Sequence, residues 1–187
     1  MDSHFFYIHL HKKLLILKIM FKLIACTNKK RAIGDKGKLL YSIKEDLINF
    51  KRMTLGNVVI MGRKTFESLP GGKPLPGRIN IILTTDEEYG IEPNDDVFIT
   101  NSIQDVVDLC EALFPDKEWF VIGGESIYKQ FLDANLVDEM RLTIVDDDKD
   151  GDTYFPTFDN NQWAVYYETL TQKSDSISFI FEILKKK

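Results

Sequence analysis

The side chains that could do acid–base or nucleophilic chemistry are unevenly spread along this 187-residue chain. The three histidines, His4, His9 and His11, all lie within the first eleven residues. The two cysteines, Cys26 and Cys110, are far apart and form no Cys-x-x-Cys pair. Ser-His-Asp and Cys-His catalysis therefore lack a histidine in the body of the chain, and zinc sites of the usual ligand types are equally unsupported. Any chemistry must depend on carboxylates, hydroxyls, backbone dipoles or a cofactor.

Among the carboxylates, Asp46 has the most informative position. It lies in a helix predicted over residues 43–54, next to Leu47 and four residues before Phe50, at the border of the apolar stripe. A carboxylate against apolar neighbours must find a donor or become protonated. Spacing alone fits a surface acid stabilised by the helix dipole equally well.

Two glycine patterns follow apolar runs and indicate phosphate binding. Gly62-Arg63-Lys64-Thr65 opens a short predicted helix, where free backbone N–H groups, two cations and a hydroxyl could hold an anion. Gly123-Gly124-Glu125-Ser126 repeats the order of strand, glycine and helix, and paired glycines let a ligand approach the backbone. Each pattern alone is equally typical of a surface turn. Together they predict phosphate sites at strand carboxyl ends, where open α/β sheets bind ligands.

The acidic run from Asp146 to Gly151 fits the first six positions of a calcium-binding EF-hand loop. The twelfth position is Thr157 rather than Glu, and the residues before the run are typical of a strand rather than a helix. We therefore expect a solvated acidic loop and no metal.

The elements that must position these groups follow from periodicity. Runs rich in β-branched and aromatic residues predict about eight strands, over residues 21–27, 58–62, 80–85, 97–100, 119–123, 140–146, 164–171 and 177–184. Helical spacing predicts the helix over 43–54, another after a Ser102-x-x-Asp105 capping signal, and a third after Gly124. This alternation indicates a single α/β domain with a central, mostly parallel sheet flanked by helices and closed by a C-terminal antiparallel hairpin. Residues 34–41 are either a mobile lid or a connecting loop.

Composition narrows the class of protein. The chain is 44% hydrophobic and 28% charged, as expected of a globular protein. Its net charge of −5 weighs against nucleic-acid binding. Two cysteines form no disulfide framework, and no apolar stretch is long enough to span a membrane. We therefore expect a cytoplasmic monomer with neither a nucleic-acid nor a membrane partner.

Met20 directly precedes the first predicted strand. We expect residues 1–19 to be a disordered or dispensable N-terminal extension and residues 20–187 to be the domain. Leu23-Ile24-Ala25-Cys26 also fits a lipoprotein cleavage box, which would make the chain a surface-anchored binding protein. Lys18 and Lys22 interrupt the apolar region that such a leader needs, so we favour a buried strand there.

In their order along the chain, the motifs from Met20 to the C-terminus resemble dihydrofolate reductase. The motifs are Leu23-Ile24-Ala25, Ile33-Gly34, Glu45-Asp46-Leu47 with Phe50-Lys51, Val59-Ile60-Met61-Gly62-Arg63-Lys64-Thr65-Phe66-Glu67-Ser68, Pro74-Leu75-Pro76-Gly77-Arg78, Ile122-Gly123-Gly124 with Tyr128, Gly151-Asp152-Thr153 with Phe155-Pro156, and Phe181-Glu182-Ile183-Leu184. The resemblance implies NADPH-dependent reduction of 7,8-dihydrofolate to tetrahydrofolate. In this reaction a hydride moves to C6 of the pterin and N5 gains a proton.

On the substrate side, the resemblance makes Asp46 the acid that binds the pterin and Thr143 the hydroxyl that hydrogen-bonds it. Arg78 resembles the cation that grips the glutamate carboxylate of the substrate. The residues that resemble the walls around the pterin and benzoyl groups are Ile24, Leu47, Phe50, Leu69 and Ile122, and the further substrate-binding residues are Ala25 and Leu75.

On the cofactor side, the resemblance assigns three groups of residues. Those expected near the 2′-phosphate of NADPH are Arg63, Lys64, Thr84 and Thr85. Those expected at its pyrophosphate are Gly62, Thr65, Gly123, Gly124, Glu125, Ser126 and Ile127. Those expected around the nicotinamide are Cys26, Ile33 and Gly34, with Tyr128 beside it as a catalytic residue.

The chain departs from the family where a Pro-Trp pair usually follows the apolar residue of the lid. Here the sequence is Leu39-Leu40-Tyr41, which frees one φ angle and replaces the indole N–H with a hydroxyl. The nearest alternative enzyme is the pyrimidine reductase of riboflavin synthesis, which shares the fold and NADPH. The placement of Asp46 and Arg78 favours folate.

Overall fold

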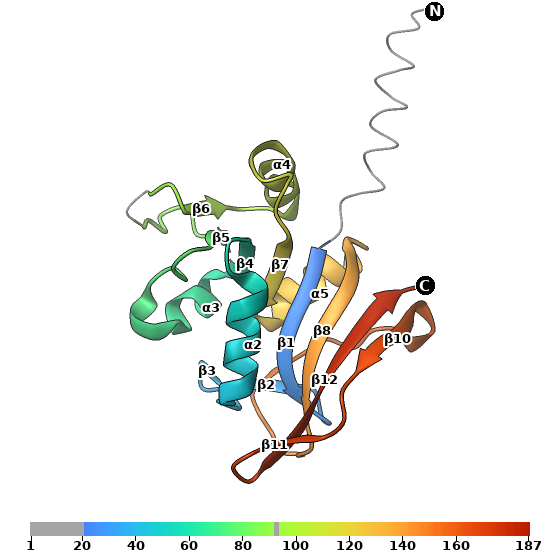
Figure 1. The fold of residues 1–187 in the computed structure, drawn as a ribbon. Coiled ribbons are helices and arrows are strands. Elements are labelled where there is room, and N and C mark those ends of the chain that lie inside the picture. The colour runs from blue at the N-terminus through green and yellow to red at the C-terminus, as the bar shows by residue number, and fades with distance from the viewer. Residues whose placement is uncertain (1–20, 92–93) are drawn as a thin grey trace, which may run out of the picture.

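The computed structural model describes residues 21–91 and 94–187 (Figure 1). The expectation for residues 1–19 lies outside them. The main sheet has nine strands in the order β10-β12-β8-β1-β7-β4-β5-β6, with β11 paired to β12. Their bounds are β1 Phe21–Asn28, β4 Val58–Gly62, β5 Ile79–Leu83, β6 Val97–Thr100, β7 Trp119–Gly123, β8 Val137–Val145, β10 Trp163–Glu168, β11 Gln172–Ser174 and β12 Ile177–Lys186.

The α/β architecture predicted from the sequence is confirmed. The strands from β8 across to β6 are parallel to their neighbours, and β12 is antiparallel to both β8 and β10. All eight predicted strands are present, and the ninth, β11, lies within the predicted C-terminal hairpin. The last strand is not at the edge, because β12 is inserted between β8 and β10.

Helices cover both faces of this sheet, as the continuous apolar strands require. They are α2 (Lys44–Thr54), α3 (Arg63–Ser68), α4 (Ile103–Leu113) and α5 (Glu125–Asp133), with short 3₁₀ turns at Pro70–Gly72 and Asn160–Gln162. Phe50 and Phe66 pack from α2 and α3 on one face, while Cys110 and Phe131 pack from α4 and α5 on the other. Figure 1 shows α2 in front of the sheet and α5 behind it. The predicted cap on α4 is present, since the Ser102 hydroxyl accepts a hydrogen bond from the Asp105 N–H at 3.1 Å.

The segment expected to be a lid or a loop contains a hairpin. Strands β2 (Ala32–Asp35), β3 (Lys38–Leu39) and β9 (Thr153–Tyr154) form a small sheet in the order β3-β2-β9. Lys36 and Gly37 have φ angles of 51° and 72°, the positive values that a two-residue hairpin turn needs. The Asp152 carboxylate accepts the Lys36 N–H at 2.8 Å and so joins this turn to the loop before β9.

No helix in the described parts of the chain is long and apolar enough to cross a bilayer.

Replacing Gly151 with Ala should destabilise the small sheet. A Cβ at this position would clash with the Gly34 carbonyl oxygen, which is backbone and cannot swing away. Overpacking of this kind costs about 1–3 kcal/mol in the free energy of unfolding, measurable by urea denaturation. Gly90→Ala is the control, because its Cβ would meet only ordinary contacts. Equal stability of the two variants would show that β2 and the loop can move apart freely.

Candidate active site

The structure joins Asp46 to Thr143 across 97 residues of sequence. Asp46 lies in the first turn of α2, and Thr143 lies on β8 beside Cys26 of β1. The Thr143 hydroxyl donates to Asp46 Oδ1 at 2.5 Å. The border position predicted for Asp46 is therefore a site facing the sheet, where the carboxylate has found the donor that its apolar surroundings require.

Two effects act on the pKa of Asp46 in opposite directions. Burial raises the pKa of Asp46 above its ordinary value, and the hydrogen bond from Thr143 lowers it. Burial also raises the pKa of the Cys26 thiol and of the Tyr128 hydroxyl, and the nearby Asp46 charge raises both further. Cys26 and Tyr128 therefore stay protonated near neutral pH. Of the three groups, Asp46 is the one whose ordinary pKa lies below neutral pH.

Tyr128 is almost fully buried on α5. Its hydroxyl donates to the Ile24 carbonyl of β1 at 2.7 Å. This bond holds the start of α5 against the strand that leads to Cys26.

The predicted apolar walls gather on one face of the sheet. Ile24 belongs to the core beneath α2 and α3, and the side chains packed on that core include Phe50, Leu69, Leu75 and Ile122. Ala25 is an exception, because its side chain belongs to the core on the opposite face. Leu47 is 43% exposed on α2, which leaves its side chain free to contact a ligand.

Arg78 is buried at the far end of α2, just before β5. Its Nε donates to the Thr54 hydroxyl at 3.2 Å, and its two terminal nitrogens donate to the carbonyls of Pro76 and Lys51 at 2.8 and 3.4 Å. A guanidinium has five N–H donors, so two remain without a partner among the described residues. These contacts fix the group in place and leave it able to bind a carboxylate.

The predicted pyrophosphate residues meet at the carboxyl ends of the adjacent strands β4 and β7. A Cβ on Gly62 would lie 3.0 Å from Ile127, and one on Gly124 would lie 3.2 Å from the Thr65 hydroxyl. Neither α3 nor α5 has a side-chain cap, so the N–H groups of their first turns have no side-chain acceptor from the cap position. The glycines thus keep open a cradle with backbone donors, which suits a phosphate group.

The predicted 2′-phosphate residues follow β4 and β5, which are also adjacent. Arg63 is paired with Glu67 at 3.0 Å, and its guanidinium lies 5.6 Å from the centre of the Tyr89 ring. Lys64 and Thr85 are exposed, while the Thr84 backbone N–H is bonded to the Thr100 carbonyl.

The remaining predicted residues lie around the hairpin and α5. Ile33 and Gly34 lie on β2, and Ser126 is exposed on α5. The carboxylate of Glu125, also on α5, accepts the Tyr154 N–H at 3.0 Å.

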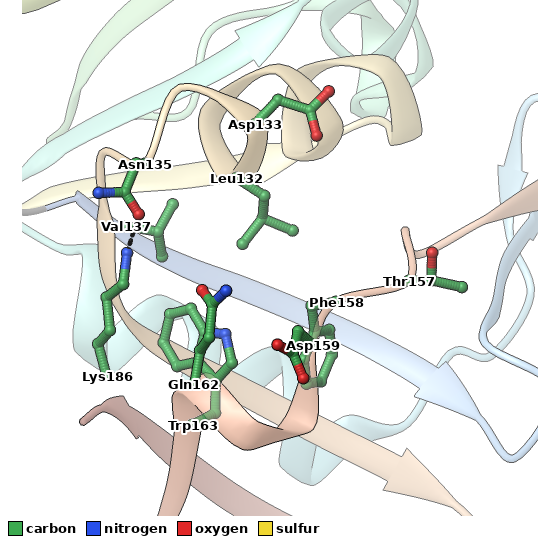
Figure 2. Close-up of a pocket in the computed structure, with 10 residues that line it drawn as sticks. All are labelled: Leu132, Asp133, Asn135, Val137, Thr157, Phe158, Asp159, Gln162, Trp163 and Lys186. Atoms are coloured by element: carbon green, nitrogen blue, oxygen red, sulfur yellow. Dashed lines mark hydrogen bonds between the residues drawn. The ribbon is translucent and has the colours of Figure 1, made fainter.

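Two cavities differ in their relation to this site. One, of about 200 Å³, lies between the end of α5 and the segment before β10, and Figure 2 shows Leu132 and Val137 on one side of it and Trp163 on the other. It contains none of the predicted site residues. The other, of about 270 Å³, lies between α2 and the strands β8 and β12, and its lining includes Ile24 and Thr143. It therefore borders Thr143, the partner of Asp46. No group of three metal-binding side chains occurs in the described ranges.

The sequence analysis missed a hydrogen-bonded group near the site that consists of Asn28, Tyr41 and Asp147. The Tyr41 hydroxyl donates to the Asp147 carboxylate at 2.8 Å and accepts from the Asn28 amide at 3.0 Å. Asp147 is 106 residues from Tyr41, so spacing along the chain held no signal for this contact.

Comparisons with known proteins match the chain to one family. The family model described as dihydrofolate reductase matches residues 20–186. A Staphylococcus aureus dihydrofolate reductase is 35% identical over 136 residues, covering 73% of this chain and 77% of that protein. A Bacillus subtilis dihydrofolate reductase is 33% identical over 167 residues, covering 88% and 92%.

The fold is similar to a solved structure of dihydrofolate reductase from Enterococcus faecalis, complexed with NADP(H) and RAB-propyl. The TM-score is 0.78 at 26% identity, covering 91% of this chain and 98% of that chain.

Replacing Thr143 with Val should raise the pKa of Asp46 further. The substitution keeps the shape of the side chain but removes the donor that favours the charged carboxylate. Carbon-13 NMR titration of the Asp46 carboxyl measures the effect. Thr169→Val is the control, because Thr169 borders the same cavity and its hydroxyl accepts from the Phe181 N–H instead of bonding to Asp46. An unchanged or lower pKa in Thr143→Val would contradict the assigned role of the hydrogen bond.

Proposed function

The chain belongs to the dihydrofolate reductase family and reduces 7,8-dihydrofolate with NADPH, and we propose that Asp46 is the acid that binds the pterin in this reaction. The observation that carries the proposal is the bond from Thr143, which holds a half-buried carboxylate over the sheet. With one oxygen accepting that bond, the carboxylate retains acceptor sites for the 2-amino group and N3 of the ring.

The apolar face that contains Ile24, Phe50 and Ile122 supports the placement of the pterin and benzoyl groups beside Asp46. Leu47, Leu69 and Leu75 complete the walls, and Ala25 contributes through its backbone because its side chain faces the other way. Arg78, at the opposite end of α2, binds the glutamate carboxylate with its two remaining donors. The substrate then lies along α2, with a charged group at each end.

The cofactor side is supported by the glycine cradle. Gly62, Gly123 and Gly124 leave the space, and Thr65 with the first turn of α5, including Glu125, Ser126 and Ile127, surrounds it. Arg63, Lys64, Thr84 and Thr85 hold the 2′-phosphate. Cys26, Ile33, Gly34 and Tyr128 surround the nicotinamide. NADPH, when bound, supplies the hydride that reaches C6 of the pterin.

Protonation of N5 depends on the electrostatics of Asp46. Its charge favours a positively charged, N5-protonated pterin over the neutral ring. Cys26 and Tyr128 carry no charge near neutral pH, so they do not compete with this effect. The protein thereby aligns the two reactants and stabilises the developing charge with one carboxylate, and no histidine is required.

We further propose that residues 20–187 form the working domain of a cytoplasmic monomer that binds no nucleic acid. The family match over residues 20–186 supports the domain bounds, and the free thiols of Cys26 and Cys110 suit a reducing compartment. The net charge of −5 disfavours nucleic acid.

Replacing Asp46 with Asn should lower the turnover of dihydrofolate at pH 7 by a hundredfold or more, since removing one electrostatic group from an active site costs roughly that much. The assay is the loss of NADPH absorbance. Glu45→Gln is the matched control, because it removes the neighbouring acid of the same helical turn. If the two variants kept similar activity, Asp46 would be a surface acid and the proposed site would be wrong.

Replacing Arg63 with Ala should weaken NADPH binding by about ten- to a hundredfold, as expected for a lost charge-assisted hydrogen bond. NADH, which lacks the 2′-phosphate, should bind almost unchanged. Fluorescence titration with both cofactors makes the comparison, and Arg52→Ala removes a helical arginine from outside the proposed cofactor site as a control. Equal losses for both cofactors would refute the assignment of Arg63.

A further inference from the structure

Tyr41 occupies the junction between the β2–β3 hairpin and α2. Its ring is 8% exposed and packs in a small core with Ile43, Val145 and Phe179. Its hydroxyl makes two hydrogen bonds: it donates to Asp147 Oδ2 at 2.8 Å and accepts from Asn28 Nδ2 at 3.0 Å. Packing in this core needs only the ring of Tyr41, so the two hydrogen bonds of the hydroxyl give this residue a second role.

Asn28 extends the contact to a third segment. Its amide nitrogen also donates to the Lys149 carbonyl at 2.7 Å. Its oxygen accepts the N–H groups of Lys30 and Ala32 at 3.0 and 2.9 Å, which shapes the turn into β2. The Tyr41 hydroxyl therefore lies where the end of β1, the loop after β8 and the approach to α2 come together.

The start of α2 needs such an external anchor. Ile43 occupies the cap position and makes no side-chain hydrogen bond there, so the helix lacks the usual means of fixing its first turn. Two side-chain bonds flank that turn instead. Tyr41 binds the loop after β8, and Asp46 binds Thr143 on β8 itself. Together they set where Asp46 lies relative to the sheet.

We propose that Tyr41 is a positioning residue for the reaction: its hydroxyl, held between Asp147 and Asn28, fixes the start of α2 so that Asp46 meets the pterin. This inference rests on the role given to Asp46 in the proposed function. The bond is charge-assisted, because hydrogen bonding from Tyr41 keeps the pKa of Asp147 below its ordinary value and the carboxylate ionised.

The first test is Tyr41→Phe, which keeps the buried ring and removes the hydroxyl. We expect the single-turnover rate of hydride transfer to fall about tenfold, the loss typical of a hydrogen bond to a charged group, with KM for dihydrofolate changing by less than about threefold. Hydrogen exchange provides a readout that is independent of activity. The Leu47 N–H, bonded to Ile43 at the start of α2, should exchange about tenfold faster in the variant.

The second test is a double-mutant cycle with Asp147→Asn. If the two groups act through one bond, Tyr41→Phe/Asp147→Asn should lose no more rate and protection than the more impaired single variant. Tyr154→Phe is the matched control, since its hydroxyl donates to the Gly151 carbonyl of the same loop at 2.7 Å without touching the start of α2. Its rate should stay within about twofold of the parent.

Parent-like rate and parent-like exchange in Tyr41→Phe would overturn the proposal, as would losses that add in the double variant. A similar tenfold loss in Tyr154→Phe would also overturn it, because any disturbance of the loop would then suffice. If instead Asp46→Asn kept parent activity, the proposed function would fail while the exchange data would still report on the Tyr41 contact.

Discussion

The site depends on keeping one carboxylate charged beside an apolar sheet. Burial raises the pKa of Asp46, and the Thr143 hydroxyl opposes that rise. The bond requires β8 to pair with β1 in the register that places Thr143 beside Cys26, and it requires α2 to begin where its first turn can reach the strand. The parallel sheet and the contacts before α2 are thus conditions for the chemistry as well as for the fold.

The same sheet explains why two ligands can meet. Strand β1 lies between β8, which carries Thr143, and β7, which leads into Gly123 and Gly124. The substrate face and the glycine cradle are therefore neighbours at the carboxyl ends of the strands, the usual place for ligands in an open α/β sheet. The hydrogen bond from Tyr128 to the Ile24 carbonyl connects the glycine cradle to the substrate face, because it holds α5 against β1.

Local features were predictable from sequence, and contacts between distant segments were not. Apolar runs and the Ser102 cap correctly predicted the eight strands and the helices, because both signals act over a few residues. The β2–β3 hairpin was missed, although Lys36-Gly37 is compatible with a two-residue turn. Spacing could not decide whether Asp46 was a surface acid, because the contact with Thr143 spans 97 residues. The alternation of side chains along a strand does place Ala25 on the face opposite Ile24, as the structure has it.

The pH dependence of hydride transfer in Asp46→Asn, measured in single turnovers beside the parent, tests the role of this carboxylate most directly. If the charge favours the N5-protonated pterin, the variant must rely on substrate protonated in solution. Its rate should then climb as pH falls, over a range where the parent is already near its plateau. Parallel profiles for the two proteins, differing by a constant factor or not at all, would contradict the role given to Asp46.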